Sequence, residues 1–187
     1  MNEEKHILTA ADKITFLRIA GTLLLVAVKP LSVGFFLLYA LTGLTDVLDG
    51  WIARKTKTTS DFGARLDSIA DLLFYAATLY CVFPALWETL PGCIWYAVAT
   101  VVLVRIAAYL TAAVKYRRFA SMHTYMNKLT GGVVFLIPFL LATPYATPYC
   151  WGVFAVSLTA SLEELILHLK NDIYHPDTKS IFLGSSE

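Results

Sequence analysis

The 26 residues DVLDGWIARKTKTTSDFGARLDSIAD, at positions 46–71, carry five of the 14 acidic residues of the chain. Apolar stretches flank and overlap this segment at 31–48 and 69–87. An ionisable group at membrane depth costs several kcal/mol when it has no partner. Carboxylates gathered at the ends of two apolar stretches therefore indicate a functional site rather than ordinary surface charge.

The four outermost aspartates of this segment form two pairs at helical spacing. Asp46 and Asp49 are three residues apart and Asp67 and Asp71 are four apart, so each pair shares one helical face. If the two helices pack antiparallel across the turn at 50–62, four carboxylates surround one volume and require counter-charge. Hard oxygen ligands favour Mg²⁺, Mn²⁺ or Ca²⁺ over zinc, and four of them suit a two-metal site.

The residues between the two pairs suit a phosphate-bearing ligand. Gly50, Ala53 and Gly63 keep side chains away from the backbone, and Arg54 offers a planar donor for phosphate. A nucleotide diphosphate fits such a groove. Divalent metal and phosphate together indicate phosphoryl transfer.

The rest of the chain is strongly apolar. Of its 187 residues, 57% are hydrophobic and 16% charged, against about 25% charged in ordinary soluble proteins. A helix needs about 17–25 residues to cross a bilayer. We predict an all-α integral membrane protein, a bundle of six transmembrane helices. The expected helices cover the apolar stretches 14–28, 31–48, 69–87, 93–114, 129–143 and 146–169.

The distribution of basic residues predicts the orientation of these helices. Lys and Arg concentrate before the first expected helix and after the second, fourth and sixth, and such segments stay in the cytoplasm. Both termini are therefore expected to be cytoplasmic. We expect one membrane domain at 1–170, beginning with a retained anchor rather than a cleaved signal peptide, and a cytoplasmic tail at 171–187. The three cysteines lack metal-site spacing and are expected to be packing residues.

The spacing Asp46-x2-Asp49-Gly50-x2-Ala53-Arg54-x8-Gly63-x3-Asp67-x3-Asp71 resembles the signature of the CDP-alcohol phosphatidyltransferase family. The resemblance implies that two divalent cations, Mg²⁺ or Mn²⁺, are held by Asp46, Asp49, Asp67 and Asp71. It also implies that Asp71 is the general base on the acceptor hydroxyl. The cytidine diphosphate would be bound by Asp49, Gly50, Ala53, Arg54, Gly63 and Asp67. Asp61 lies outside the signature and is expected to cap the helix that follows it.

The resemblance implies transfer of the phosphatidyl group from CDP-diacylglycerol to a small alcohol, with release of CMP, in phospholipid biosynthesis. It further implies a homodimer with one active site per subunit. We expect the active site to face the cytoplasm at the plasma (inner) membrane. The partners are then the two substrates and the lipid bilayer, with no nucleic acid.

Basic residues elsewhere in the chain are the candidates for binding the acceptor alcohol. Arg105 lies inside an apolar stretch, where a lone Arg is costly unless it snorkels to the interface or meets an anion. Arg118 and Lys128 follow in the next basic segment, and the expected acceptor is glycerol 3-phosphate. Thr15-x2-Arg18 resembles the opening of glycerophosphate transferases.

Two positions depart from the pattern of those transferases, and the first expected helix also lacks their usual Asn-Pro lead. Ser68 and Leu72 stand where they usually have Pro and Lys, and this part of the sequence is more similar to the serine-using branch. Serine, inositol phosphate and phosphatidylglycerol therefore remain open as acceptors. Glu163 and Glu164 are assigned no role.

Two other classes of protein could use intramembrane carboxylates or a nucleotide groove. A divalent-cation transporter should carry acids toward the outer side as well, which the last three expected helices lack. A non-catalytic CDP-lipid binder would keep the glycines and Arg54 but would not need Asp71. The complete spacing favours the enzyme.

Overall fold

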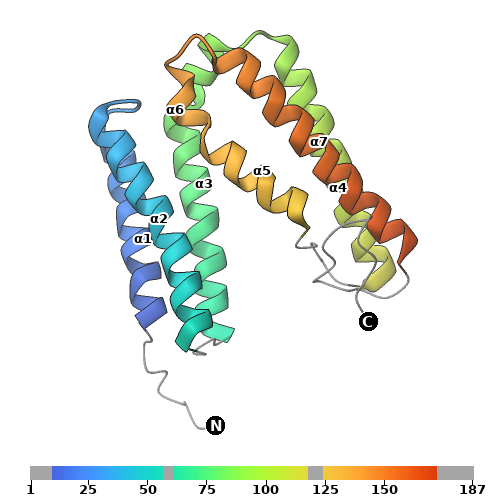
Figure 1. Ribbon diagram of the computed structural model, residues 1–187, viewed down its shortest axis with the longest axis horizontal. Coiled ribbons are helices and arrows are strands. Elements are labelled where there is room, and N and C mark those ends of the chain that lie inside the picture. The colour runs from blue at the N-terminus through green and yellow to red at the C-terminus, as the bar shows by residue number, and fades with distance from the viewer. Residues whose placement is uncertain (1–9, 57–60, 118–123, 172–187) are drawn as a thin grey trace. The chain divides into compact units, whose positions relative to one another are not determined.

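The computed structural model is all-helical, which confirms the predicted class (Figure 1). It describes residues 10–56, 61–117 and 124–171, with side chains in these ranges except at 10, 11, 46–56, 61, 62, 64 and 65. The chain divides into two compact units, residues 1–87 and 88–187. Within the described ranges the helices are α1 (Ala10–Ala27), α2 (Val33–Thr56), α3 (Asp61–Thr89), α4 (Cys93–Tyr116), α5 (Tyr125–Phe135), α6 (Ile137–Leu141) and α7 (Ala146–Lys170).

In the first unit, α1 and α2 form a helical hairpin (Figure 1). The turn between them places Leu31 in the left-handed region, with φ of 57°. The Ser32 hydroxyl then accepts a hydrogen bond from the Phe35 N–H at 3.2 Å and so begins α2. Gly21 allows the helices to approach closely, since a Cβ there would lie 2.7 Å from Oγ1 of Thr42.

Helix α3 joins this hairpin through buried rings. Tyr39 of α2 stacks on Phe35 and on Phe74 of α3, with the Tyr39 and Phe74 ring centroids 5.3 Å apart. All three rings are buried, and aromatic pairs of this kind add to the free energy gained from burial alone. Cys81 is buried farther along α3, and its thiol approaches the Leu25 carbonyl of α1 at 3.8 Å. The three helices therefore share one core.

In the second unit, α4 and α7 pack along each other and run in the same direction (Figure 1). Their carboxyl ends are joined by Lys115, which donates to the Leu169 carbonyl at 3.0 Å, and by the Tyr116 hydroxyl, which donates to the Asn171 carbonyl at 2.7 Å. Helices α5 and α6 both pack on α7. The Tyr149 hydroxyl ties α7 to α5 by donating to the Val133 carbonyl at 2.8 Å.

The prediction of a single helix at 129–143 is wrong in detail. The structure begins α5 at Tyr125 and ends it at Phe135, after which Leu136 separates it from the short α6. Pro138 lies in the first turn of α6, where its missing N–H needs no partner. Helix α5 is about 16 Å long, roughly half the thickness of a bilayer core.

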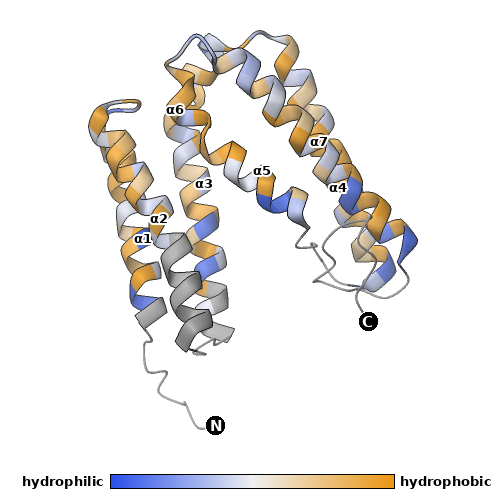
Figure 2. Cartoon of the chain, viewed as in Figure 1, coloured by the Kyte–Doolittle hydropathy of each residue, from blue (hydrophilic) through white to orange (hydrophobic). Residues whose placement is uncertain are grey.

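Within the described residues, three helical stretches are long and apolar enough to cross a membrane. They are Leu66–Thr89, Cys93–Tyr116 and Ala146–Lys170. Much of their apolar surface faces outward, as with Leu72 and Val114, which are 70% and 82% exposed, and Figure 2 shows hydrophobic residues along these helices. The apolar part of α2 with described side chains is shorter, at Val33–Thr45. Helix α1 carries Asp12, Lys13 and Arg18, which interrupt its apolar sequence.

Replacing Gly21 with Ala is expected to destabilise the α1–α2 hairpin, because the new methyl group meets Thr42. Overpacking of this kind costs about 1–3 kcal/mol, which exceeds or offsets the gain in helix propensity. Gly152→Ala on α7 is the matched control, since a Cβ there meets nothing within 4 Å. Thermal unfolding in detergent should give a lower melting temperature for G21A than for G152A, and equal melting temperatures would contradict the close packing.

Candidate functional site

The acidic motif lies on the end of α2 and the start of α3. Asp46, Asp49, Gly50, Ala53 and Arg54 all fall in the last turns of α2, so the predicted helical spacing of the first pair is confirmed. Their side chains lie outside the described part of the structure. The expected cap at Asp61 is likewise untested, since only its backbone is described, as the first residue of α3.

The second half of the motif lies on α3 and has described side chains at three positions. Gly63 is half-buried in the first turn of the helix. Asp67 and Asp71 follow one turn apart, as predicted, and their side chains are 46% and 43% exposed. These two carboxylates therefore combine a fixed helical position with an open side.

Both carboxylates contact the same guanidinium nitrogen. Nη1 of Arg18 lies 3.0 Å from Oδ1 of Asp67 and 2.6 Å from Oδ1 of Asp71. Arg18 comes from α1, and its side chain is 1% exposed. Sequence reasoning used Arg18 only as part of a resemblance and missed this pairing. The sequence signal for such a pairing is that Arg18 stands alone as a charged residue in the apolar stretch 14–28.

The backbone around Arg18 is held in place by neighbouring contacts. The Thr22 hydroxyl donates to the Arg18 carbonyl at 2.9 Å, and both residues are buried. Gly21 adjoins them at the point where α1 approaches Thr42 of α2. Arg18 therefore reaches α3 from the closely packed side of α1.

The carboxylates of Asp67 and Asp71 suit a cation as metal ligands. Oδ1 of Asp67 and Oδ1 of Asp71 converge on one positively charged nitrogen, which shows that both carboxylates can face one positive centre. Carboxylate oxygens are the ligands that Mg²⁺ and Mn²⁺ prefer. The described side chains contain no group of three metal-binding residues. A complete site would need the carboxylates of Asp46 and Asp49, which lie outside that set.

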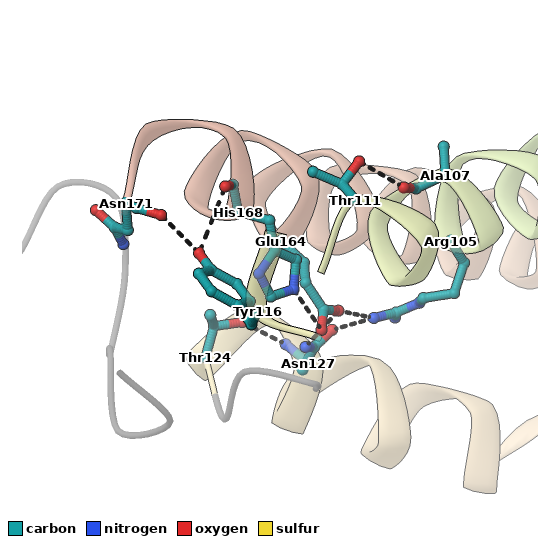
Figure 3. Close-up of polar contacts among 9 residues, drawn as sticks. All are labelled: Arg105, Ala107, Thr111, Tyr116, Thr124, Asn127, Glu164, His168 and Asn171. Atoms are coloured by element: carbon teal, nitrogen blue, oxygen red, sulfur yellow. Dashed lines mark hydrogen bonds and ion pairs between the residues drawn. The ribbon is translucent and has the colours of Figure 1, made fainter. Parts of the chain in front are cut away.

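A second polar cluster lies in the other unit, between α4, α5 and α7 (Figure 3). Nη1 of Arg105 is ion-paired with Oε2 of Glu164 and donates to Oδ1 of Asn127 at 3.0 Å. The Asn127 amide also donates to Oε2 of Glu164 at 3.1 Å. Glu164 is fully buried, whereas Arg105 remains 23% exposed. The expectation that Glu164 has no role is therefore incomplete, since it supplies the charge that Arg105 needs.

The same cluster fixes the start of α5. The Thr124 hydroxyl accepts a hydrogen bond from the Asn127 N–H at 3.2 Å and caps the helix. His168 is fully buried on α7, with Nε2 3.8 Å from Oε1 of Glu164. Lys128 follows Asn127 directly and is exposed. Arg118, the third candidate for acceptor binding, lies outside the described residues.

Comparison with known proteins identifies the class to which this chain belongs. Residues 8–162 match the family described as CDP-alcohol phosphatidyltransferase, which is well over half of the chain. The chain is therefore a member of this family. Together with the apolar helices, membership makes it a multi-pass membrane protein.

Several relatives are similar over parts of the chain. A CDP-diacylglycerol–serine O-phosphatidyltransferase from Methanocaldococcus jannaschii is 42% identical over 80 residues, covering 42% of this chain and 37% of the relative. Two CDP-diacylglycerol–glycerol-3-phosphate 3-phosphatidyltransferases also match. The one from Haemophilus influenzae is 41% identical over 61 residues, covering 31% of this chain and 33% of the relative. The one from Pseudomonas fluorescens is 30% identical over 111 residues, covering 58% and 56%.

Each of these matches covers less than two thirds of the relative's own length. No solved structure matches the chain significantly.

The pairing of Arg105 with Glu164 predicts strong coupling between the two residues. Glu164→Met should destabilise the fold by about 3 kcal/mol, because it leaves Arg105 without its counter-charge. The double variant R105M/E164M should lose less free energy of unfolding than the two single variants lose in sum. Free energies of unfolding in detergent measure this, with E88Q at an exposed acid as the control. Additive losses would contradict the pairing.

Proposed function

We propose that this chain transfers the phosphatidyl group of CDP-diacylglycerol to a small alcohol and releases CMP, as a step in phospholipid biosynthesis. The observation that carries the proposal is the complete motif at 46–71, which lies within the residues matched to the family. The relatives named above catalyse, by their names, phosphatidyl transfer from CDP-diacylglycerol. The convergence of Asp67 and Asp71 on one positive nitrogen adds a structural reason.

In this proposal the four motif aspartates hold two divalent cations, Mg²⁺ or Mn²⁺. Their carboxylates are hard oxygen ligands from two consecutive helices, α2 and α3. When bound, the cations would neutralise the phosphate oxygens of the donor. The four ligands are Asp46, Asp49, Asp67 and Asp71.

The cytidine diphosphate is proposed to lie between the same two helices. Small residues permit its close approach, and Arg54 supplies a planar donor for its phosphates. Gly63 is half-buried, in keeping with a backbone that a ligand can approach. The proposed contacts are Asp49, Gly50, Ala53, Arg54, Gly63 and Asp67.

Asp71 is proposed as the general base. It takes the proton of the acceptor hydroxyl, whose oxygen then bonds to the lipid-side phosphorus. The bond between this phosphorus and the bridging oxygen breaks, and its electron pair leaves with CMP. A carboxylate has two oxygens, so Asp71 can hold a cation with one of them and receive the proton on the other.

Glycerol 3-phosphate is the proposed acceptor, bound through Arg105, Arg118 and Lys128. The positive charge of these residues suits its phosphate, and relatives with this acceptor in their names support it. Serine is the second candidate. Arg105 is already neutralised by Glu164, and a neutral ion pair complements a zwitterion better than a phosphate. Inositol phosphate and phosphatidylglycerol remain alternatives with the same chemistry.

We further propose that the chain crosses the plasma (inner) membrane six times, with both termini and the active site in the cytoplasm. The fifth crossing would be the broken helix formed by α5 and α6. The positive residues between helices favour this orientation. A homodimer is the expected assembly. The rival classes to the transferase are a divalent-cation transporter and a non-catalytic CDP-lipid binder.

The proposal is tested by CMP release from CDP-diacylglycerol in detergent, measured with each candidate alcohol in turn. Release should require Mg²⁺ or Mn²⁺ and one alcohol, and the lipid product then identifies the acceptor. Asp71→Asn should reduce turnover by at least about 100-fold while most donor binding is retained. Glu88→Gln, at an exposed acid, is the control for the substitution.

Three results would contradict parts of this account. No release with any alcohol would favour the lipid binder. Divalent-cation uptake into liposomes would favour the transporter. Retained turnover in D71N would remove the base assignment while leaving the donor chemistry intact.

A further inference from the structure

Arg18 has no assigned part in the proposed chemistry, although it contacts two of the proposed metal ligands. We infer that Arg18 is an internal counter-ion that competes with a divalent cation for Asp67 and Asp71. Binding of the cation to these carboxylates is then coupled to their release by Arg18. The inference rests on the proposed function, because it assumes that these aspartates bind the cation.

The positive charge of Arg18 lies beside both carboxylates. A single nitrogen, Nη1 of Arg18, lies within hydrogen-bonding distance of Oδ1 of both aspartates. A cation held by the same two oxygens would occupy nearly the same place, at about 2.0–2.1 Å from each oxygen for Mg²⁺. Two positive centres so close repel each other strongly. The guanidinium must therefore withdraw when the cation binds.

Arg18 and the two aspartates differ in burial. The Arg18 side chain is 1% exposed, whereas those of Asp67 and Asp71 are 46% and 43% exposed. The guanidinium reaches the carboxylates from inside the unit, and the carboxylates keep an open side. A cation can therefore approach from the open side while Arg18 is still in contact. Competition does not require α1 to leave the core.

The backbone that carries Arg18 is anchored by its neighbours. The bond from Thr22 to the Arg18 carbonyl and the close approach of Gly21 to Thr42 fix the backbone of α1 here. A fixed backbone keeps the guanidinium near the carboxylates after they release it. The positive charge therefore opposes the cation throughout, and by linkage each lowers the affinity of the carboxylates for the other.

A purely orienting role for Arg18 gives the opposite expectation. If Arg18 only aligned Asp67 and Asp71, its removal would let the two carboxylates move apart and would weaken cation binding. If Arg18 competes, its removal takes away the positive charge that opposes the cation and strengthens cation binding. The sign of the change in affinity separates the two roles.

The test is a Mn²⁺ titration of the full chain in nanodiscs without donor lipid, following free Mn²⁺ by electron paramagnetic resonance. Arg18→Met should bind Mn²⁺ about fivefold more tightly than the wild type, or better. Arg18→Lys keeps the charge and should stay near the wild-type affinity. Lys170→Met removes an exposed positive charge in the other unit and should leave the affinity unchanged. Arg18→Gln is the second uncharged variant should R18M not fold.

The outcomes separate this inference from the proposed function. Weaker or unchanged Mn²⁺ binding in the uncharged variants, with normal binding in the wild type, overturns the competition and leaves the proposed metal site standing. Equal tightening in K170M also overturns it, since the effect would not belong to Arg18. A wild type without saturable Mn²⁺ binding, matching Asp67→Asn, overturns the metal site and the inference together.

Discussion

A charged side chain within an apolar helix needs an opposite charge beside it, and this constraint governs both units of the structure. In the first unit Arg18 of α1 lies between Asp67 and Asp71 of α3. In the second, Arg105 of α4 is paired with Glu164 of α7. Leaving the buried member of either pair, Arg18 or Glu164, without its partner would cost several kcal/mol. Each pair therefore joins helices far apart in sequence, and each lies where the proposed chemistry needs a fixed polar group.

The two pairs differ in a way that bears on function. Asp67 and Asp71 are nearly half exposed beside a buried Arg, so the negative side is open to a ligand. In the other unit the acid is fully buried and Arg105 is partly exposed, so the positive side is the accessible one. An open negative site suits cations, and an accessible Arg suits an anionic or carboxylate-bearing group. The first unit thus offers carboxylates that suit a cation, and the second offers an Arg that suits an anionic group.

The sequence was sufficient to predict the helical class and the positions of the motif on its helices. The apolar runs and the spacing of Asp67 and Asp71 are local features, which follow from helical geometry. The pairing of Arg18 with those aspartates depends on which face of α1 meets α3, and no local pattern gives that. Glu164 was passed over for the same reason, because its partner lies 59 residues away. The break at Leu136 was missed because apolar composition continues through it.

The central claim is that the four aspartates of α2 and α3 surround one two-metal site. The most direct measurement is an anomalous-difference map from crystals of the full chain grown with Mn²⁺ and a CDP-lipid. The account predicts two peaks bounded by Asp67 and Asp71 on one side and by Asp46 and Asp49 on the other. Peaks elsewhere, or Asp46 and Asp49 directed away from Asp67 and Asp71, would contradict it.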